Sequence, residues 1–208
     1  MKKLFLFITV LYICAARSQT PVLPLFDNPE YGEVWGAYYK DIDNDFSNFI
    51  GTWEYINGAT SLKIVIKKKS ECPDSQNKMY EDFLIGAYRY IENGVEKVNT
   101  LSQMNDSTLG VYSHSIFGNL IIKNTSPPVC NDCGLNERRV NLTMHDPTRE
   151  NIVGLSGSLV LKRFDAGTIQ KIKMNLRQEG NIIYIDGNPP QYNSLSVPWG
   201  EYILTKVN

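Results

Sequence analysis

From Gly51 to the end of the chain, residues that favour turns recur about every ten positions, and this spacing limits each regular element to a short strand. The first signal is Asn57-Gly58, the strongest two-residue pattern for a β-hairpin. After it, the apolar residues of 62–67 alternate with polar ones, as in a strand with one buried face. No stretch keeps the three-and-four spacing of an amphipathic helix. The sequence therefore predicts an all-β protein.

About ten further strands are expected between these turn signals. The segment 80–92 is the longest, and we expect it to bend or bulge at Gly86, because glycine inside a strand often marks such a site. So many short antiparallel strands close most simply into one up-and-down barrel or into a strongly curled sheet that closes on itself. The other expected strands cover 53–56, 95–101, 108–112, 115–123, 138–144, 151–155, 158–163, 169–178, 181–186 and 201–207.

The tripeptide Gly51-Thr52-Trp53 stands at the start of the first of these strands. Many small closed barrels begin with Gly-x-Trp, where the indole fills one end of the barrel and the glycine lets the backbone bend without a Cβ clash. We therefore expect Trp53 to be a core residue that plugs the barrel.

The N-terminus has the three-part layout of a secretory signal peptide. Lys2 and Lys3 precede an apolar stretch over residues 4–13, and small residues follow up to Ser18. The apolar stretch is too short to span a bilayer. We expect cleavage after residues 1–18 and an exported mature chain, periplasmic or extracellular, that begins near Gln19.

Lipid anchoring is the alternative, since Cys14 ends the apolar stretch. However, Ile13 precedes it, where a lipobox has a small residue, so cleavage to a soluble form is favoured. No later segment is apolar enough for a membrane helix. Residues 19–48 are punctuated by proline and are expected to form an extended leader, and 49–208 to form the barrel-like domain.

A calcium loop is a possible interpretation of Asp41, Asp43 and Asp45, which alternate as at the start of an EF-hand. Yet Phe46 occupies the position that needs glycine, and Thr52 the position that needs a bidentate glutamate. The segment is better explained as a polar turn or a single helical turn whose phenylalanines cap the barrel.

The charge of the mature chain argues against nucleic acid as a partner. Removal of residues 1–18 takes away Lys2, Lys3 and Arg17, so that 18 basic residues face 22 acidic ones and the formal net charge is −4. Nucleic-acid binding needs a concentrated basic face. The run 67–69 of three lysines fits a solvated strand end that discourages edge-to-edge pairing.

Three cysteines remain in the mature chain: Cys72, Cys130 and Cys133. A zinc site would need a second Cys or His pair, and His114 and His145 are isolated in sequence. In an oxidising compartment a disulfide is favoured over a metal or redox site. It joins either Cys130 to Cys133 or Cys72 to one of them, and the pairing stays open.

No catalytic motif is present. Adjacent side chains on an extended backbone point apart, so Asp146 is poorly placed to orient His145 as a catalytic base. The segment 154–158 fails the Gly-x-Ser-x-Gly pattern, and no phosphate loop, dinucleotide fingerprint or metalloprotease motif occurs. We expect a non-enzymatic protein without cofactor or bound metal.

The chain resembles an uncharacterised family of exported flavobacterial (Bacteroidota) proteins with a Gly-Thr-Trp domain of unknown function. The resemblance rests on 49–55, Asn57-Gly58, 62–68, the pattern of 80–94 and a final Leu204-Thr205-Lys206 strand. It implies no activity. Gly51-x-Trp53 is also similar to the first strand of lipocalins, which are binding barrels. That likeness implies a basic residue over the indole from a late strand, either Lys206 or Lys162.

Two functions follow from these observations. The first is a non-catalytic, lipocalin-like module that binds a small apolar ligand or peptide in the barrel. The second is a structural or interaction protein of the cell envelope, with a filled barrel, no ligand and an exposed aromatic patch near Trp35, Tyr38 and Tyr39. For the first, the expected ligand-binding residues are Trp53, Leu62, Ile64, Phe83, Ile85, Tyr88 and Leu142.

Overall fold

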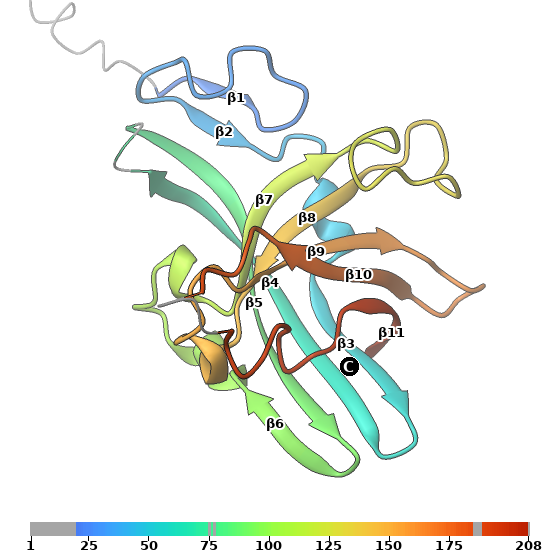
Figure 1. Ribbon diagram of the computed structural model, residues 1–208. Coiled ribbons are helices and arrows are strands. Elements are labelled where there is room, and N and C mark those ends of the chain that lie inside the picture. Colours follow the sequence, from blue (N-terminus) through green and yellow to red (C-terminus); the bar gives the residue numbers. More distant parts are fainter. Residues whose placement is uncertain (1–19, 75, 77, 185–188, 208) are drawn as a thin grey trace, which may run out of the picture.

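Eight antiparallel strands form a closed barrel in the computed structural model, which describes residues 20–74, 76, 78–184 and 189–207. Each barrel strand pairs with the next, and the last pairs with the first, as in an up-and-down barrel (Figure 1). The eight are β3 (Gly51–Asn57), β4 (Thr60–Asp74), β5 (Met79–Glu92), β7 (Ile116–Ile122), β8 (Arg139–Met144), β9 (Ser156–Arg163), β10 (Lys171–Glu179) and β11 (Gly200–Val207). This architecture confirms the expected fold class.

One edge of β5 carries three different partners along its length. At its start β5 pairs with β2 (Tyr38–Lys40), and in its middle, at Leu84–Gly86, it pairs with β7 and closes the barrel. At its far end it forms a hairpin with β6 (Val95–Asn99). The turn residues Asn93 and Gly94 both have positive φ, the type I′ geometry that joins two strands most tightly.

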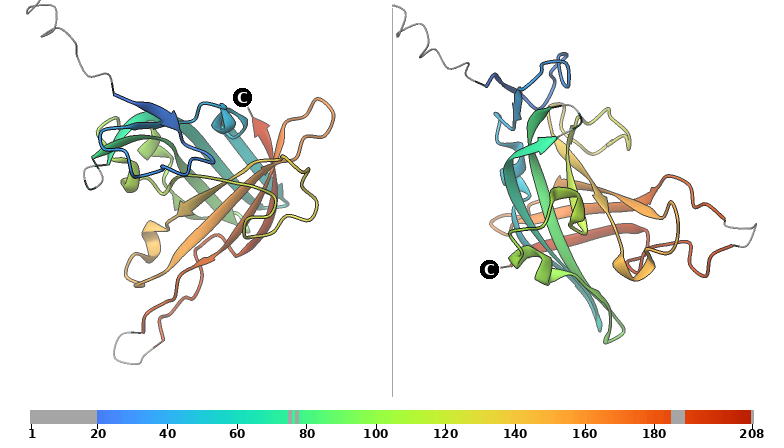
Figure 2. Two further views of the ribbon diagram at one scale, coloured as in Figure 1. Left: turned by 90° about the horizontal axis from the view of Figure 1, so that it is seen from above. Right: turned by 90° about the vertical axis from the view of Figure 1, so that its left-hand side faces the viewer.

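The segment before the barrel is docked on it. β1 (Val22–Pro24) pairs in parallel with β2, which extends the sheet beyond the start of β5 (Figures 1 and 2). The 3₁₀ helix η1 (Asp45–Asn48) then places Phe46 in the barrel core, next to Phe49. The expected helical turn with phenylalanine caps is thus confirmed.

The three aspartates that alternate as in a calcium loop make contacts within the protein. Asp41 accepts hydrogen bonds from the backbone N–H groups of Asp45 and Phe46, at 2.9 and 3.0 Å. The carboxylates of Asp43 and Asp45 both pair with Arg138. The contacts of Arg138 tie the segment before the barrel to the residue that directly precedes β8.

Three expected strands are wrong. Residues 108–112 form the end of a turn, a short irregular stretch and the start of η3 (Val111–Ser113), because Val111 packs in a cluster with Phe83 and Ile85 of β5. Residues 151–155 form turns at Gly154, whose φ is +82°. Residues 181–184 are irregular, and the rest of that expected strand lies outside the described residues, as does the signal peptide with Cys14. The other two 3₁₀ helices are η2 (Leu101–Asn105) and η4 (Pro147–Arg149).

The expected bulge at Gly86 is also absent, since the register of β4 and β5 runs unbroken past it. A Cβ atom at Gly86 would lie 2.7 Å from the carbonyl oxygen of Val65 and 3.3 Å from Cβ of Ile116. The glycine therefore allows the close approach of β7 that closes the barrel. The shift in the β4–β5 ladder falls instead between Lys69 and Cys72.

Apolar side chains from the barrel strands fill the interior. Leu62, Ile64 and Ile66 of β4 point inward and are fully buried. They pack in one cluster with side chains of every other barrel strand, among them Trp53, Leu84, Tyr88, Ile116, Leu142, Leu159, Met174 and Leu204. In the part of the chain that the structure describes, no helix is long and apolar enough to cross a membrane.

Candidate functional site

The residues expected to bind a ligand divide between the two faces of the sheet. Five of them belong to the packed interior: Trp53, Leu62, Ile64, Tyr88 and Leu142. Phe83 and Ile85 lie in a separate cluster on the outer face of β5, with Cys72 and Val111. The structure therefore does not bring the seven together. Without a bulge at Gly86, positions 83 and 85 must face the opposite way from position 88.

Trp53 is fully buried at one end of the barrel, and its indole N–H donates to the carbonyl of Phe49 at 2.7 Å. The Lys206 ammonium lies 5.4 Å from the ring centroid, as the lipocalin resemblance implies for one of two lysines. Gly51 makes this possible: its φ is +136°, and a Cβ there would lie 2.7 Å from Cε of Lys206. Lys162, the other candidate, pairs with Asp132 instead.

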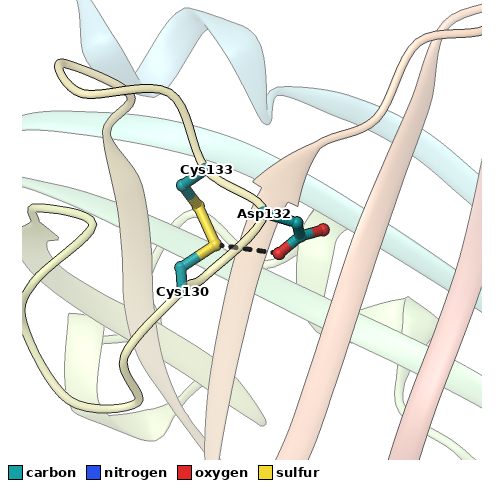
Figure 3. A group of neighbouring side chains, drawn as sticks. All are labelled: Cys130, Asp132 and Cys133. Atoms are coloured by element: carbon teal, nitrogen blue, oxygen red, sulfur yellow. Dashed lines mark hydrogen bonds between the residues drawn. A yellow bond between two sulfur atoms is a disulfide. The ribbon is translucent and has the colours of Figure 1, made fainter.

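Cys130 and Cys133 form the disulfide (Figure 3), and Cys72 is a buried free thiol. Burial raises the pKa of the Cys72 thiol to about 11, so it is protonated at neutral pH. Asp132, between the bonded cysteines, lies 3.2 Å from Nζ of Lys162 and 3.6 Å from Nζ of Lys173. Disulfide sulfurs carry no thiolate charge, so this loop in its oxidised form offers little to a metal ion.

Two neighbouring carboxylates on β5, Glu81 and Asp82, are both buried but face opposite sides of the sheet. Asp82 points into the barrel end, where Nζ of Lys68 lies 2.7 Å from Oδ2. The Tyr38 hydroxyl donates to its Oδ1 at 2.6 Å, and the Asp41 N–H to its Oδ2 at 3.0 Å. Burial alone would raise the pKa of Asp82, but Lys68 and Tyr38 hold it below its ordinary value.

Glu81, on the outer face, is 3% exposed and has only neutral hydrogen-bond partners. The Tyr31 hydroxyl and the Asn119 amide, the latter at 2.9 Å, both donate to Oε1. Among the described residues, no group donates to Oε2 and no cation pairs with the carboxylate. Burial raises the pKa of Glu81 above its ordinary value, and the two hydrogen bonds offset only part of this effect.

Glu81 lines a hollow of about 390 Å³ on the outer face of β5, β7 and β8. Phe83, Tyr112 and Phe117 also line it, and Tyr112 is 62% exposed. Tyr112 packs edge-on against both phenylalanines, with ring centroids 5.8 and 5.4 Å away. We call this space the acidic hollow; its other polar lining residues are Tyr31, Asp74, Asn119, Asn141, Thr143 and Glu179.

A second hollow, of about 670 Å³, continues from the first, because Tyr112 lines both. The two histidines of the chain, His114 and His145, line it. The His145 ring stacks on Phe117 at a centroid distance of 5.6 Å. Phe83, Tyr112, Phe117 and His145 thus form one row of rings along both hollows, which we call the aromatic row.

The adjacent residues His145 and Asp146 have separate partners, in keeping with the poor catalytic geometry expected from the sequence. His145 stacks on the aromatic row, while Asp146 accepts from the backbone N–H groups of Thr148 and Ser196. Burial alone would raise the pKa of Asp146, but hydrogen bonds from the side chains of Thr148 and Ser196, together with those from their backbone N–H groups, hold it below its ordinary value.

Sequence reasoning missed most of the outer-face site: Glu81, Tyr31, Asn119, Tyr112 and Phe117. A usable signal exists only for Glu81. It is a charged residue inside the longest expected strand, 80–92, where it must either face solvent or find a buried partner, and the adjacent Asp82 carries the same signal. The residues that surround it come from the segment before the barrel, from η3 and from β7.

The fold and these hollows define a closed eight-stranded β-barrel protein with a filled interior and an aromatic, acidic outer face. A protein-family model described as a family of unknown function (DUF6705) matches residues 1–207. The chain belongs to this family. No curated protein and no solved structure shows a significant match.

Proposed function

We propose that this protein is an exported, non-catalytic binding protein of flavobacterial origin that holds a small ligand with an apolar or aromatic body against the aromatic row. The observation that carries the proposal is the contrast between the two faces of the sheet. The barrel interior is occupied by fully buried side chains, whereas the outer face has two adjoining hollows with aromatic walls. Concave apolar surfaces with a few convergent polar groups are the usual form of ligand sites.

The lipocalin-like version of this proposal places the ligand inside the barrel. It has less support, since Trp53, Leu62, Ile64 and Tyr88 are each fully buried by one another and by the rest of the core cluster. Entry of a ligand would require these side chains to move apart and would cost packing energy.

Three further observations support the remaining parts of the proposal. The predicted signal peptide and the Cys130–Cys133 disulfide both fit an oxidising compartment. Asp146 accepts hydrogen bonds from backbone N–H groups and does not orient His145, which supports a non-catalytic role.

Two-dimensional NMR with 2-phenylethanol as a neutral aromatic probe tests where a ligand binds. We expect shift changes at Phe83, Tyr112 and Phe117 that disappear in Tyr112→Ala. Tyr184→Ala is the matched control, because Tyr184 is similarly exposed, at 57%, and lines neither hollow. Shift changes confined to Leu62 and Tyr88 would instead support an interior site.

The second candidate, a structural protein of the cell envelope without a ligand, is favoured by the filled interior alone. Its expected aromatic patch is wrong in part: Trp35 is 69% exposed, but Tyr38 and Tyr39 are buried because β2 docks on β5. Absence of any shift change with the probe would favour this candidate. Export is tested separately, by fractionation of a flavobacterial host and N-terminal sequencing, which should begin near Gln19.

A further inference from the structure

The starting observation is a buried charge without a counter-charge. Ionised side chains that are almost fully buried are normally paired, because the loss of hydration is otherwise uncompensated. Asp82 follows this rule through Lys68, whereas Glu81, one residue earlier, has two neutral donors and no cation among the described residues. Both of its partners donate to one oxygen, Oε1, and no described residue donates to the other oxygen. None of the described residues supplies a cation to Glu81, so this position is open to a cationic ligand.

The acidic hollow has the electrostatic character that such a partner needs. Three of its lining residues bear carboxyl groups, Asp74, Glu81 and Glu179, and none of its described lining residues is Lys, Arg or His. The negative potential extends to the tyrosines: after burial, Glu81 is a main cause that raises the pKa of both Tyr31 and Tyr112. An anionic ligand would be repelled here.

The aromatic walls suit a cation in the same way. The face of a phenyl or phenol ring carries negative partial charge and attracts a cation within about 6 Å of its centroid. Elsewhere in the protein Lys206 over Trp53 and Lys78 over Trp35 make this contact. In the hollow, Phe83, Tyr112 and Phe117 make no such contact with a described Lys or Arg.

We propose that the acidic hollow binds a small organic cation, a primary ammonium group on an aromatic or apolar body, whose charge pairs with Glu81. This inference rests on the proposed function and specifies its ligand class. The free oxygen of Glu81 selects the kind of cation. A guanidinium would need both oxygens for its two parallel hydrogen bonds, and Oε1 already accepts two. A quaternary ammonium has no N–H group to donate to Oε2. A primary ammonium can donate an N–H to Oε2 while the apolar or aromatic body of the ligand packs on the aromatic row.

Three probes with the same aromatic body test the inference: 2-phenylethylamine, 2-phenylethanol and phenylacetate, which are cationic, neutral and anionic at neutral pH. Their affinities are measured by NMR titration on the full mature chain and on two variants. Glu81→Gln removes the charge at nearly constant shape. Glu96→Gln is the control, because it removes the same charge from an exposed pair with Arg89, away from the hollow.

We expect the amine to bind the wild type and Glu96→Gln at least about tenfold more tightly than the alcohol, because truncating one partner of a buried charge pair costs more than this. In Glu81→Gln the advantage of the amine over the alcohol should disappear. Of the three probes, phenylacetate should bind most weakly to the wild type. Far-ultraviolet circular dichroism and the unfolding midpoint establish that each variant is folded; should Glu81→Gln not fold, the comparison of the three probes on the wild type decides.

The outcomes separate the two proposals. Equal affinity of amine and alcohol at the hollow, or an amine advantage that survives in Glu81→Gln, would overturn the assignment of a cation while leaving the outer-face site intact. If none of the three probes causes shift changes at millimolar concentration, both the assignment of a cation and the proposed function would be overturned.

Discussion

Asp82 and Glu81 are adjacent on β5, equally buried and chemically alike, yet they have opposite surroundings. Each accepts a hydrogen bond from a tyrosine of the segment before the barrel, Tyr38 for Asp82 and Tyr31 for Glu81. Only Asp82 also has a lysine, Lys68, and it faces a packed barrel end. Glu81 faces an open hollow.

The difference indicates what each carboxylate contributes. The charge of Asp82 is compensated within the protein, and its contacts fasten the N-terminal segment to the barrel. Glu81 bears the cost of burial without that compensation, and such an arrangement is typical of positions where a ligand supplies the missing interaction. We therefore propose that one face of β5 contributes to stability and the opposite face to binding.

The largest expected effect comes from Asp82→Asn. The substitution removes the closer of the two carboxylates that pair with the Lys68 ammonium, whose side chain is only 21% exposed. The remaining partner is the buried Asp41 carboxylate, at 3.6 Å. We expect a loss of about 3 kcal/mol in the free energy of unfolding, as for other broken buried pairs. Urea unfolding measures it, with Glu96→Gln as the exposed-pair control. A loss no greater than that of the control would show that Asp82 is not a structural anchor.

The two tyrosines give a matched pair of smaller effects. Tyr38→Phe and Tyr31→Phe should each cost about 1.5 kcal/mol, because each removes a hydrogen bond to a charged acceptor. The pKa of the carboxyl group should respond differently. Glu81 loses one of two donors and its pKa should rise clearly, whereas Asp82 keeps Lys68 and its pKa should change less. Carboxyl ¹³C NMR measures both; a larger rise at Asp82 would contradict the comparison.

Glu81→Gln should change stability little at neutral pH. The amide oxygen can still accept from Tyr31 and Asn119, and the substitution removes a buried charge that no described cation compensates. We expect the free energy of unfolding to stay within about 0.5 kcal/mol of the wild type or to rise. A loss comparable to that of Asp82→Asn would mean that Glu81 is structural.

The smallest expected effect is a difference in pH dependence. The pKa of Asp82 is lowered in the folded state, so its stabilising contribution is present above the unfolded pKa and is lost as the pH falls through the folded pKa. The pKa of Glu81 is raised, so its contribution is present at low pH and is lost as the pH rises through the folded pKa. Urea unfolding from about pH 3 to about pH 7, the range in which carboxyl groups titrate, measures the free energy of unfolding as a function of pH. Asp82→Asn and Glu81→Gln should change the slope of this dependence in opposite directions.

Local sequence signals predicted the barrel because strands and turns depend on neighbouring residues. Asn93-Gly94 forms its tight turn, and Lys206 lies over Trp53 as the likeness to lipocalins implies. The error over Phe83 and Ile85 has an identifiable origin. The run 83–88 is apolar on both faces, so it has no alternation to read, and an expected bulge at Gly86 would have turned Phe83 and Ile85 inward.

The outer site could not be predicted because its parts meet only in the closed barrel. Tyr31 lies 50 residues before Glu81 and Asn119 lies 38 after it. Nor does the sequence distinguish Glu81 from Asp82, since which of two adjacent acids finds a lysine depends on the register with β4. There Lys68 is opposite Leu84, on the same face as Asp82.

The central claim is that Glu81 lacks a cation and Asp82 has one. Carboxyl ¹³C NMR titration of both residues in one sample, with and without 2-phenylethylamine, tests it directly. We expect the pKa of Glu81 to lie above its ordinary value in the free protein and to fall when the amine binds. The pKa of Asp82 should lie below its ordinary value both with and without the amine. A Glu81 pKa that is already low in the free protein, or that the bound amine does not lower, would contradict it.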